Sequence, residues 1–220
     1  MLDEAVDNEL IAQNPIRQIA LKRIISTVAK KSEFEADPFT EEEQQIILNA
    51  TSGQTKNLIQ FGFWSGLRTS ELIALKWADI DFNDRVVNIT RAKVCNVLKS
   101  PKTKSGVRTL MLLPKAYDAL YNQLEYTANS EYVFHNPNTQ QPWASSNKVS
   151  DMWRNLLSKL DISYRNCYQM RHTFTSTLLS NGENPLWVST QTGHVNVNMI
   201  FKHYGKWLPK KNTYTLIGIY

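Results

Sequence analysis

The sequence contains little cysteine and no long apolar run. Its two cysteines, Cys95 and Cys167, are far apart and form no C-x-x-C pair, so they predict neither a disulfide framework nor a cysteine zinc site. No stretch approaches the roughly 18 consecutive apolar residues of a membrane-spanning helix, and the N-terminal segment MLDEAVDNEL is acidic where a signal peptide would be basic. We therefore expect a protein that acts in the cytoplasm and has no membrane partner.

The sequence also lacks the residues that two classes of phosphate enzyme need. It has no P-loop motif, which makes an ATP-driven reaction unexpected. A two-metal nuclease needs closely placed carboxylates, and no partner cluster accompanies the acidic residues Glu71, Asp79, Asp81 and Asp84. We interpret these four as helix bracing and a turn before the first predicted strand, and we expect no metal ion and no cofactor.

The charge of the chain is unevenly distributed. The 220 residues carry a net charge of +5, and 42% of them are hydrophobic, enough for a real core. Residues 1–50 hold ten Asp or Glu against five Lys or Arg, so the net charge of the remaining 170 residues is +10. A basic domain of this kind is compatible with a nucleic acid partner.

The pattern of breaks predicts a short first segment and one large domain. An amphipathic stretch over residues 1–14 ends at Asn14-Pro15, and a mixed, charged segment ends at Asp37-Pro38. One or two turns cannot bury a core alone. We therefore expect residues 1–37 to be the tail of a preceding domain plus a linker, and residues 38–220 to be the main domain.

Within the main domain the pattern predicts an α+β fold, mainly helical, with a small three-stranded antiparallel sheet. Thr40 and Glu43 have the form of a capping box that opens a helix. The apolar periodicity and the breaks between segments predict helices at 41–51, 55–64, 68–76, 115–128, 146–160, 165–180, 185–192 and 196–203. Runs rich in β-branched residues predict strands at 85–90, 93–99 and 107–113.

Five short motifs together carry a family resemblance. They are GLRTSEL (66–72), KTKSGVRTL (102–110), YQMRHTF (168–174), TGH (192–194) and HYGKW (203–207). In this order and spacing they resemble the tyrosine recombinase, or phage integrase, family, and the match covers residues 38–210. The resemblance implies the fold of the DNA breaking-rejoining enzymes and the catalytic domain of a prophage or genomic-island integrase. It also implies that residues 1–37 are the C-terminal remnant of a preceding helical DNA-binding domain plus a linker.

The resemblance implies two catalytic arginines, Arg68 and Arg171. A guanidinium is a planar fork of donors that binds two phosphate oxygens and stays charged at any working pH. Donors already aimed at the oxygens of a five-coordinate phosphorus lower the barrier to its formation. His194 occupies the position where the family has a histidine or tryptophan that donates a hydrogen bond to a phosphate oxygen.

The resemblance implies that Lys104 is the general acid. A flexible ammonium at the tip of the predicted hairpin could reach the minor groove and protonate the departing 5′ oxygen. Lys102 lies two residues away, but Lys104 precedes Ser105-Gly106, where the family lysine lies. A solvated lysine that contacts backbone phosphate is the alternative.

Tyr204 is the implied nucleophile, because it lies ten residues after His194. Attack by its phenolate would form a 3′-phosphotyrosine that keeps the bond energy of the cleaved strand, so religation needs no ATP. Tyr168 departs from the family, which usually has histidine three residues before the second arginine. A phenol is a poor base at neutral pH, so the departure leaves the proton route open. His172 is expected on another face of its helix, as a structural residue that does not contact the substrate. Glu71 is expected to hold His172 or Arg68 in position.

The predicted function is site-specific DNA recombination, which integrates or excises a phage or mobile element. A run of six basic residues without an acid is predicted to contact DNA phosphates, namely Arg91, Lys93, Lys99, Lys102, Lys104 and Arg108. The expected partners are double-stranded attachment sites, three further copies in a homotetramer, and an excisionase or a host DNA-bending protein. Two alternatives are a catalytically impaired DNA-binding protein of the same fold and a type IB topoisomerase-like enzyme.

Overall fold

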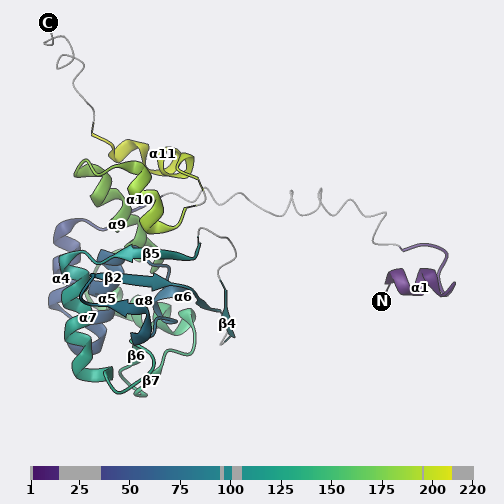
Figure 1. Ribbon diagram of the computed structural model, residues 1–220, viewed down its shortest axis with the longest axis horizontal. Helices are drawn as coiled ribbons and strands as arrows, with labels where there is room; N and C mark the ends of the chain where they lie inside the picture. Colours follow the sequence, from purple (N-terminus) through teal and green to yellow (C-terminus); the bar gives the residue numbers. More distant parts are fainter. Residues whose placement is uncertain (1, 15–35, 95–96, 101–105, 195, 210–220) are drawn as a thin grey trace, which may run out of the picture. The chain divides into compact units, whose positions relative to one another are not determined.

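The computed structural model describes residues 2–14, 36–94, 97–100, 106–194 and 196–209 (Figure 1). The chain forms two compact units, Met1–Glu35 and Ala36–Tyr220. In the first, helix α1 spans Leu2–Asp7, and the Asn14 amide donates a 2.8 Å hydrogen bond to Asp3. The second unit contains every other element described below. The assignment of the first unit to a preceding domain stays a prediction.

The second unit begins with two helices whose ends the sequence specifies. Helix α4 (Glu41–Asn49) opens with the predicted capping box, in which the Glu43 N–H donates to the Thr40 hydroxyl and the Thr40 N–H donates to the Glu43 carboxylate. Helix α5 (Gly53–Ser65) ends at Gly66, whose φ of 64° is in the left-handed region. Only glycine adopts that conformation at no steric cost, so the chain turns sharply just before Arg68.

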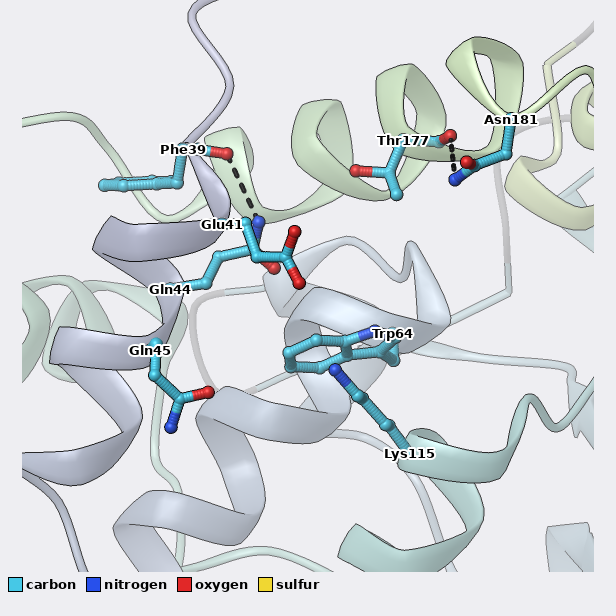
Figure 2. A pocket seen from close by; sticks show the side chains of 8 residues that line it. All are labelled: Phe39, Glu41, Gln44, Gln45, Trp64, Lys115, Thr177 and Asn181. Atoms are coloured by element: carbon cyan, nitrogen blue, oxygen red, sulfur yellow. Dashed lines mark hydrogen bonds between the residues drawn. The ribbon is translucent and has the colours of Figure 1, made fainter.

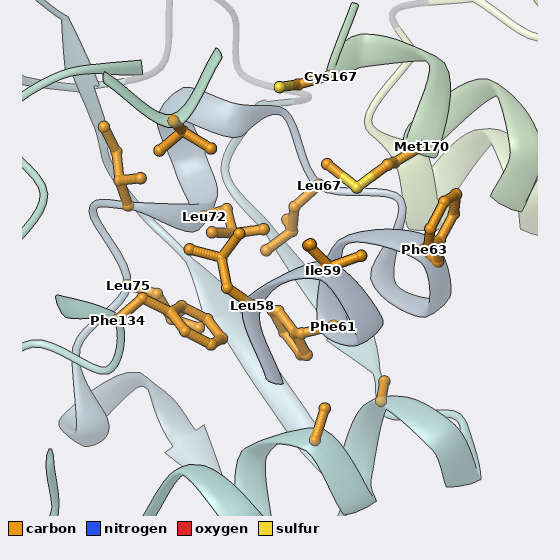
Figure 3. Close-up of a cluster of buried hydrophobic side chains, with 14 of the residues drawn as sticks. Leu58, Ile59, Phe61, Phe63, Leu67, Leu72, Leu75, Phe134, Cys167 and Met170 are labelled. Carbon is orange, nitrogen blue, oxygen red and sulfur yellow. The ribbon is translucent and has the colours of Figure 1, made fainter. Parts of the chain in front are cut away.

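Helix α5 lies at the centre of the main hydrophobic core. Its side chains Leu58, Ile59, Phe61 and Phe63 are at most 2% exposed, and they pack with residues from α6, α9 and the sheet (Figure 3). Each such side chain stabilises the fold by roughly 1.5–3 kcal/mol relative to exposure. Because α5 is covered on several sides, it is a rigid base for the loop that follows it.

The predicted three-stranded antiparallel sheet is confirmed, but one of its strands was assigned wrongly. The strand order is β1 (Ile80–Asp81), β2 (Val86–Ile89) and β5 (Arg108–Met111). The predicted strand at 93–99 instead forms a separate hairpin of β3 (Ala92–Val94) and β4 (Val97–Lys99). A run of β-branched residues fits one strand or two short ones equally well, because periodicity does not show where a chain reverses.

Three further α-helices, α6, α7 and α8, contribute to the core. Helix α6 (Thr69–Leu72) is shorter than the predicted 68–76, because the chain leaves it to bond with a distant loop, where the Val133 N–H donates to Leu75 O. A 3-10 helix, η1 (Trp77–Asp79), leads into β1. Helix α7 (Pro114–Thr127) packs against α5, and a short hairpin of β6 (His135–Asn136) and β7 (Gln141–Pro142) leads to helix α8 (Ser146–Lys159).

The last helices gather at one end of the unit, next to β5 (Figure 1). They are α9 (Tyr168–Ser180), α10 (Pro185–Thr192), α11 (Asn198–Tyr204) and the 3-10 helix η3 (Gly205–Trp207). Helix α9 begins three residues later than predicted, since the Arg165 side chain binds Glu43 and the Pro38 carbonyl outside the helix. A second apolar cluster joins them through Leu179, Val188, Ile200 and Tyr204. Among the described residues, no helix is long and apolar enough to cross a membrane.

Candidate active site

The candidate site begins at the turn between α5 and α6, where Arg68 is the N-cap of α6. Its Nη1 donates a 2.6 Å hydrogen bond to Oε1 of Glu71, and its backbone N–H donates to Oε2 of the same carboxylate. The Arg68 side chain is 36% exposed, whereas that of Glu71 is 3% exposed. The buried Glu71 carboxylate therefore fixes the position of the Arg68 guanidinium, and part of the Arg68 side chain stays accessible to solvent.

Glu71 is bound by a second guanidinium, that of Arg108 on β5. The Nη2 of Arg108 lies 3.0 Å from Oε2 and its Nη1 lies 3.2 Å from Oε1. Burial acts to raise the pKa of the Glu71 carboxyl, but the hydrogen bonds and charges of Arg108 and Arg68 outweigh it and lower that pKa. The support expected from Glu71 is therefore present in the geometry. The predicted contact of Arg108 with DNA phosphates is corrected, because only 6% of its side chain is exposed and the side chain binds Glu71 inside the protein.

Arg171 lies on α9 with a relative exposure of 0%. Its Nη1 donates to the Gly66 carbonyl at 2.8 Å, and its Nη2 lies 3.4 Å from Nε2 of His194. No described residue accepts a hydrogen bond from its Nε. Burial is the main reason that its pKa falls to about 10, a value at which it is still charged at neutral pH. A buried cation beside two other guanidinium groups and without a carboxylate partner of its own is costly, and an anion bound beside it would offset that cost.

His194 follows the left-handed Gly193 that ends α10. Its Nδ1 lies 2.7 Å from the Thr192 hydroxyl, which itself donates to the Val188 carbonyl at 2.7 Å. Burial, with the nearby charge of Arg171 next in size, lowers the pKa of His194 to about 3. At neutral pH the ring is neutral, so it can act as a hydrogen-bond donor or acceptor but adds no charge.

Tyr204 is the last residue of α11 and is 1% exposed. Its hydroxyl forms a short hydrogen bond with Nδ1 of His172, and its ring centroid lies 6.3 Å from that of His194. Burial raises the pKa of Tyr204 to about 12, against a hydrogen bond with the Thr175 side chain and the charge of Arg171, which lower it. The phenol therefore keeps its proton while no substrate is bound.

Tyr168, at the start of α9, lies between these groups. Its hydroxyl hydrogen-bonds with the Arg68 guanidinium, and its ring centroid lies 5.8 Å from the guanidinium carbon of Arg171. The edge of its ring meets His172 at a centroid distance of 4.9 Å. The residue at the position of the missing histidine thus contacts both arginines and the ring of His172.

The structure gathers five of the six predicted catalytic residues, which are Arg68, Tyr168, Arg171, His194 and Tyr204. Lys104 and its neighbour Lys102 lie outside the described residues. The placement of His172 is corrected, because its ring does not lie behind the site but touches the hydroxyl of Tyr204. Sequence reasoning missed this contact because α11 follows α9 by many residues, and only the packing of the two helices brings them together.

The other described residues that were predicted to contact DNA phosphates do not all lie free on the surface. Arg91 pairs with Asp79 at 2.5 Å, and the Lys93 ammonium donates to the Trp143 carbonyl at 2.8 Å. Lys99 is exposed on β4.

Three groups that sequence reasoning did not select also belong to the site: the Gly66 carbonyl and the hydroxyls of Thr175 and Thr192. The TGH motif contained the last of them, but only the fold gives it a role.

A separate hollow of about 400 Å³ lies elsewhere on the unit, and Figure 2 shows it between α4, α5 and α9. Trp64, Lys115 and Glu41 are among its lining residues, and none of the site residues above lines it. Within the described part of the chain, no group of three or more His, Cys, Asp or Glu side chains could hold a metal ion.

The cluster carries an excess of positive charge around one phenol. Three guanidinium groups accompany the single carboxylate of Glu71, and the two histidines are neutral. Planar guanidinium donors and neutral imidazoles suit the oxygens of a phosphodiester. The hydroxyl of Tyr204 is a nucleophile of the kind that attacks phosphorus.

Comparison with known proteins agrees with this geometry. Residues 37–210 match the model of the phage integrase family. The chain belongs to the phage integrase family. Prophage integrase IntR of Escherichia coli (strain K12) is 30% identical over 83% of this chain and 50% of its own length. A XerC-like tyrosine recombinase of Caldanaerobacter subterraneus is 27% identical over 95% of this chain and 60% of its own length.

The fold of this integrase-family chain also matches a solved structure. The Tn1549 transposon integrase in complex with a circular intermediate DNA is 22% identical and aligns with a TM-score of 0.71 over 97% of this chain and 72% of that one. The second unit thus has the fold of a tyrosine recombinase catalytic domain. The chain spans half to three fifths of the length of the two sequence relatives named above.

Proposed function

We propose that this chain cleaves and rejoins DNA strands at specific sites through a covalent 3′-phosphotyrosine on Tyr204. The observation that carries the proposal is the buried guanidinium of Arg171, which has no carboxylate partner among the described residues and lies beside a phenol. A phosphodiester seated there would receive donors from Arg171 and Arg68, and from Nε2 of His194 once the Thr192 hydroxyl turns to donate to Nδ1. The family match supports the same chemistry.

In the proposed reaction, the donors act on the non-bridging oxygens of the phosphodiester. Negative charge grows on those oxygens as phosphorus becomes five-coordinate, and fixed donors stabilise it without reorganisation. Arg171 is held by the Gly66 carbonyl and Arg68 by Glu71, so neither guanidinium needs to be ordered when DNA binds. Tyr168 contributes by holding Arg68 through its hydroxyl.

The leaving group in this proposal is the 5′ oxygen of the cleaved strand. Lys104, from the sequence, is proposed to protonate it as general acid. The phosphotyrosine conserves the energy of the broken bond, and attack by a 5′ hydroxyl from another strand reverses the step. No nucleotide cofactor is required.

The biological setting is proposed from the relatives. Relatives include a prophage integrase and the transposase of transposon Tn916 from Enterococcus faecalis, so integration or excision of a mobile element is the proposed role. The proposed partners are double-stranded attachment sites, a homotetramer on DNA, and an excisionase or host bending protein, with the cytoplasm as the proposed location. A helical DNA-binding domain before residue 38 belongs to the same proposal.

A trapping assay tests the reaction. A nicked duplex that loses a short fragment on cleavage should leave a covalent protein–DNA adduct with the wild-type chain and none with Tyr204→Phe. Tight DNA binding without an adduct would instead identify a non-catalytic binding protein. Relaxation of supercoiled plasmid without a specific site would identify a topoisomerase-like enzyme.

A further inference from the structure

The proposed reaction requires a group that accepts the proton of Tyr204. As the oxygen–phosphorus bond forms, the phenolic oxygen becomes acidic and must release that proton. A histidine three residues before Arg171 is what the family resemblance implies, but this chain has Tyr168 there. A phenol is a poor base at neutral pH, so another group must serve.

The geometry around the phenolic oxygen identifies that group. Nδ1 of His172 hydrogen-bonds with the hydroxyl of Tyr204, and the two ring centroids lie 5.5 Å apart at an interplanar angle of 36°. His172 is 3% exposed and lies on α9, the helix that also carries Arg171. A base within hydrogen-bond reach of the proton is the first geometric requirement for general base catalysis.

Tyr168 and His194, the other titratable side chains near the phenolic oxygen, make hydrogen bonds with other residues. The hydroxyl of Tyr168 hydrogen-bonds with Arg68. His194 directs Nδ1 to Thr192 and Nε2 to Arg171. These contacts leave His172 as the imidazole that faces the phenolic oxygen.

We propose that His172 is a catalytic residue, the general base that takes the proton of Tyr204 during strand cleavage. The inference rests on the proposed function of Tyr204 as nucleophile. In the step, the bond from the Tyr204 oxygen to phosphorus forms and the bond from phosphorus to the 5′ oxygen breaks. The phenolic proton moves to Nδ1 of His172, and the 5′ oxygen takes a proton from Lys104. Religation reverses both transfers.

Burial and the charges around His172 keep its imidazole neutral while no DNA is bound. Burial is the main cause, followed by Arg171 on α9 and His203 on α11, and together they lower the pKa of His172 to about 4. The imidazole is therefore neutral at pH 7. Tyr168 and Tyr204 are the other titratable groups against its ring. Because a bound phosphodiester brings negative charge, it favours the imidazolium as the proton arrives.

The first test measures the pH dependence of cleavage in His172→Asn. The asparagine amide can replace Nδ1 in a hydrogen bond but cannot take the proton. We expect adduct formation to slow by about 100-fold at pH 7, within the range for a lost general base. The rate should then rise about tenfold per pH unit between pH 7 and 9, because the phenol must ionise unaided. Tyr168→Phe, the comparison variant, should be slower than wild type but should not acquire this slope.

The second test separates the proton of the nucleophile from that of the leaving group. A DNA substrate with sulfur in the 5′ bridging position has a leaving group that needs no general acid. His172→Asn should stay slow on this substrate, whereas Lys104→Ala should recover. Recovery of His172→Asn, a loss that does not depend on pH, or a rate within threefold of wild type would each overturn the proposal.

A third measurement uses the wild-type chain and does not depend on a variant that folds. Nitrogen-15 NMR of the labelled histidines should show His172 neutral at pH 7, with Nδ1 unprotonated and the proton on Nε2. A proton on Nδ1 would contradict the assignment, since that nitrogen could not then accept one. Failure of the underlying function gives a different result: the wild-type chain would form no adduct, or Tyr204→Phe would still form one.

Discussion

Replacement of Arg171 by lysine keeps the charge and removes the planar fork. In the structure one guanidinium bonds the Gly66 carbonyl at 2.8 Å and approaches Nε2 of His194 at 3.4 Å, and its Nε remains for a phosphate. A single ammonium cannot keep the carbonyl contact and also supply two donors to a phosphodiester. Loss of one preorganised donor costs about 3–4 kcal/mol of transition-state stabilisation. We therefore expect Arg171→Lys to form the covalent adduct about 100- to 1,000-fold more slowly.

The assay is single-turnover adduct formation on the nicked duplex, with DNA affinity measured on an intact duplex. Affinity should change much less than rate, because the charge remains. Arg154→Lys is the matched control, since Arg154 is 57% exposed on α8, where it pairs with Asp151 and lies over the Tyr164 ring. A rate for Arg171→Lys within tenfold of wild type would refute the reasoning, and so would an equal loss in both variants.

Three further predictions concern stability. Gly66→Ala should lower the free energy of unfolding in urea by about 3 kcal/mol, because φ is +64° and the new Cβ would lie 2.4 Å from a phenylalanine ring. Gly182→Ala, with φ +84° and nothing within 4 Å, should cost only about 1 kcal/mol, and equal losses would count against the packing argument. Glu71→Gln should destabilise by about 3–5 kcal/mol, because it leaves two guanidinium groups without their carboxylate. Since the folded pKa of Glu71 is lowered, the wild-type carboxylate contributes stability above pH 4.5 that is lost as the pH falls through the folded pKa, and the variant should lack this loss. The pKa values of His172 and His194 fall to about 4 and about 3 on folding, so the unfolded chain binds protons first below pH 6.5. Stability should therefore drop as the pH falls from 6.5 toward 4, by up to about 1.4 kcal/mol per pH unit for each histidine, and urea midpoints that stay level over this range would contradict both shifts.

Local signals in the sequence identified most of the helices. The Thr40 capping box and the Asn184–Pro185 start of α10 fix helix ends through bonds within a few residues, and Gly66 ends α5 by its left-handed backbone angle. Such bonds are independent of the rest of the fold, so sequence reasoning can find them. The length of α6 and the strand order could not be found in this way. Both depend on pairing with residues far along the chain, as in the bond from Val133 to Leu75.

The sequence by itself determined which residue types are present for the chemistry: Arg68 and Arg171, His172 and His194, Tyr204, and no carboxylate cluster. Tertiary structure decided how they are used. Arg108 was predicted to contact DNA phosphates, but in the fold it binds Glu71 on α6 and the Gln191 carbonyl on α10. His172 looked like a supporting residue, but the packing of α11 on α9 brings Tyr204 against it. Side-chain roles of this kind depend on distances between elements that are far apart in sequence, and only the folded chain sets those distances.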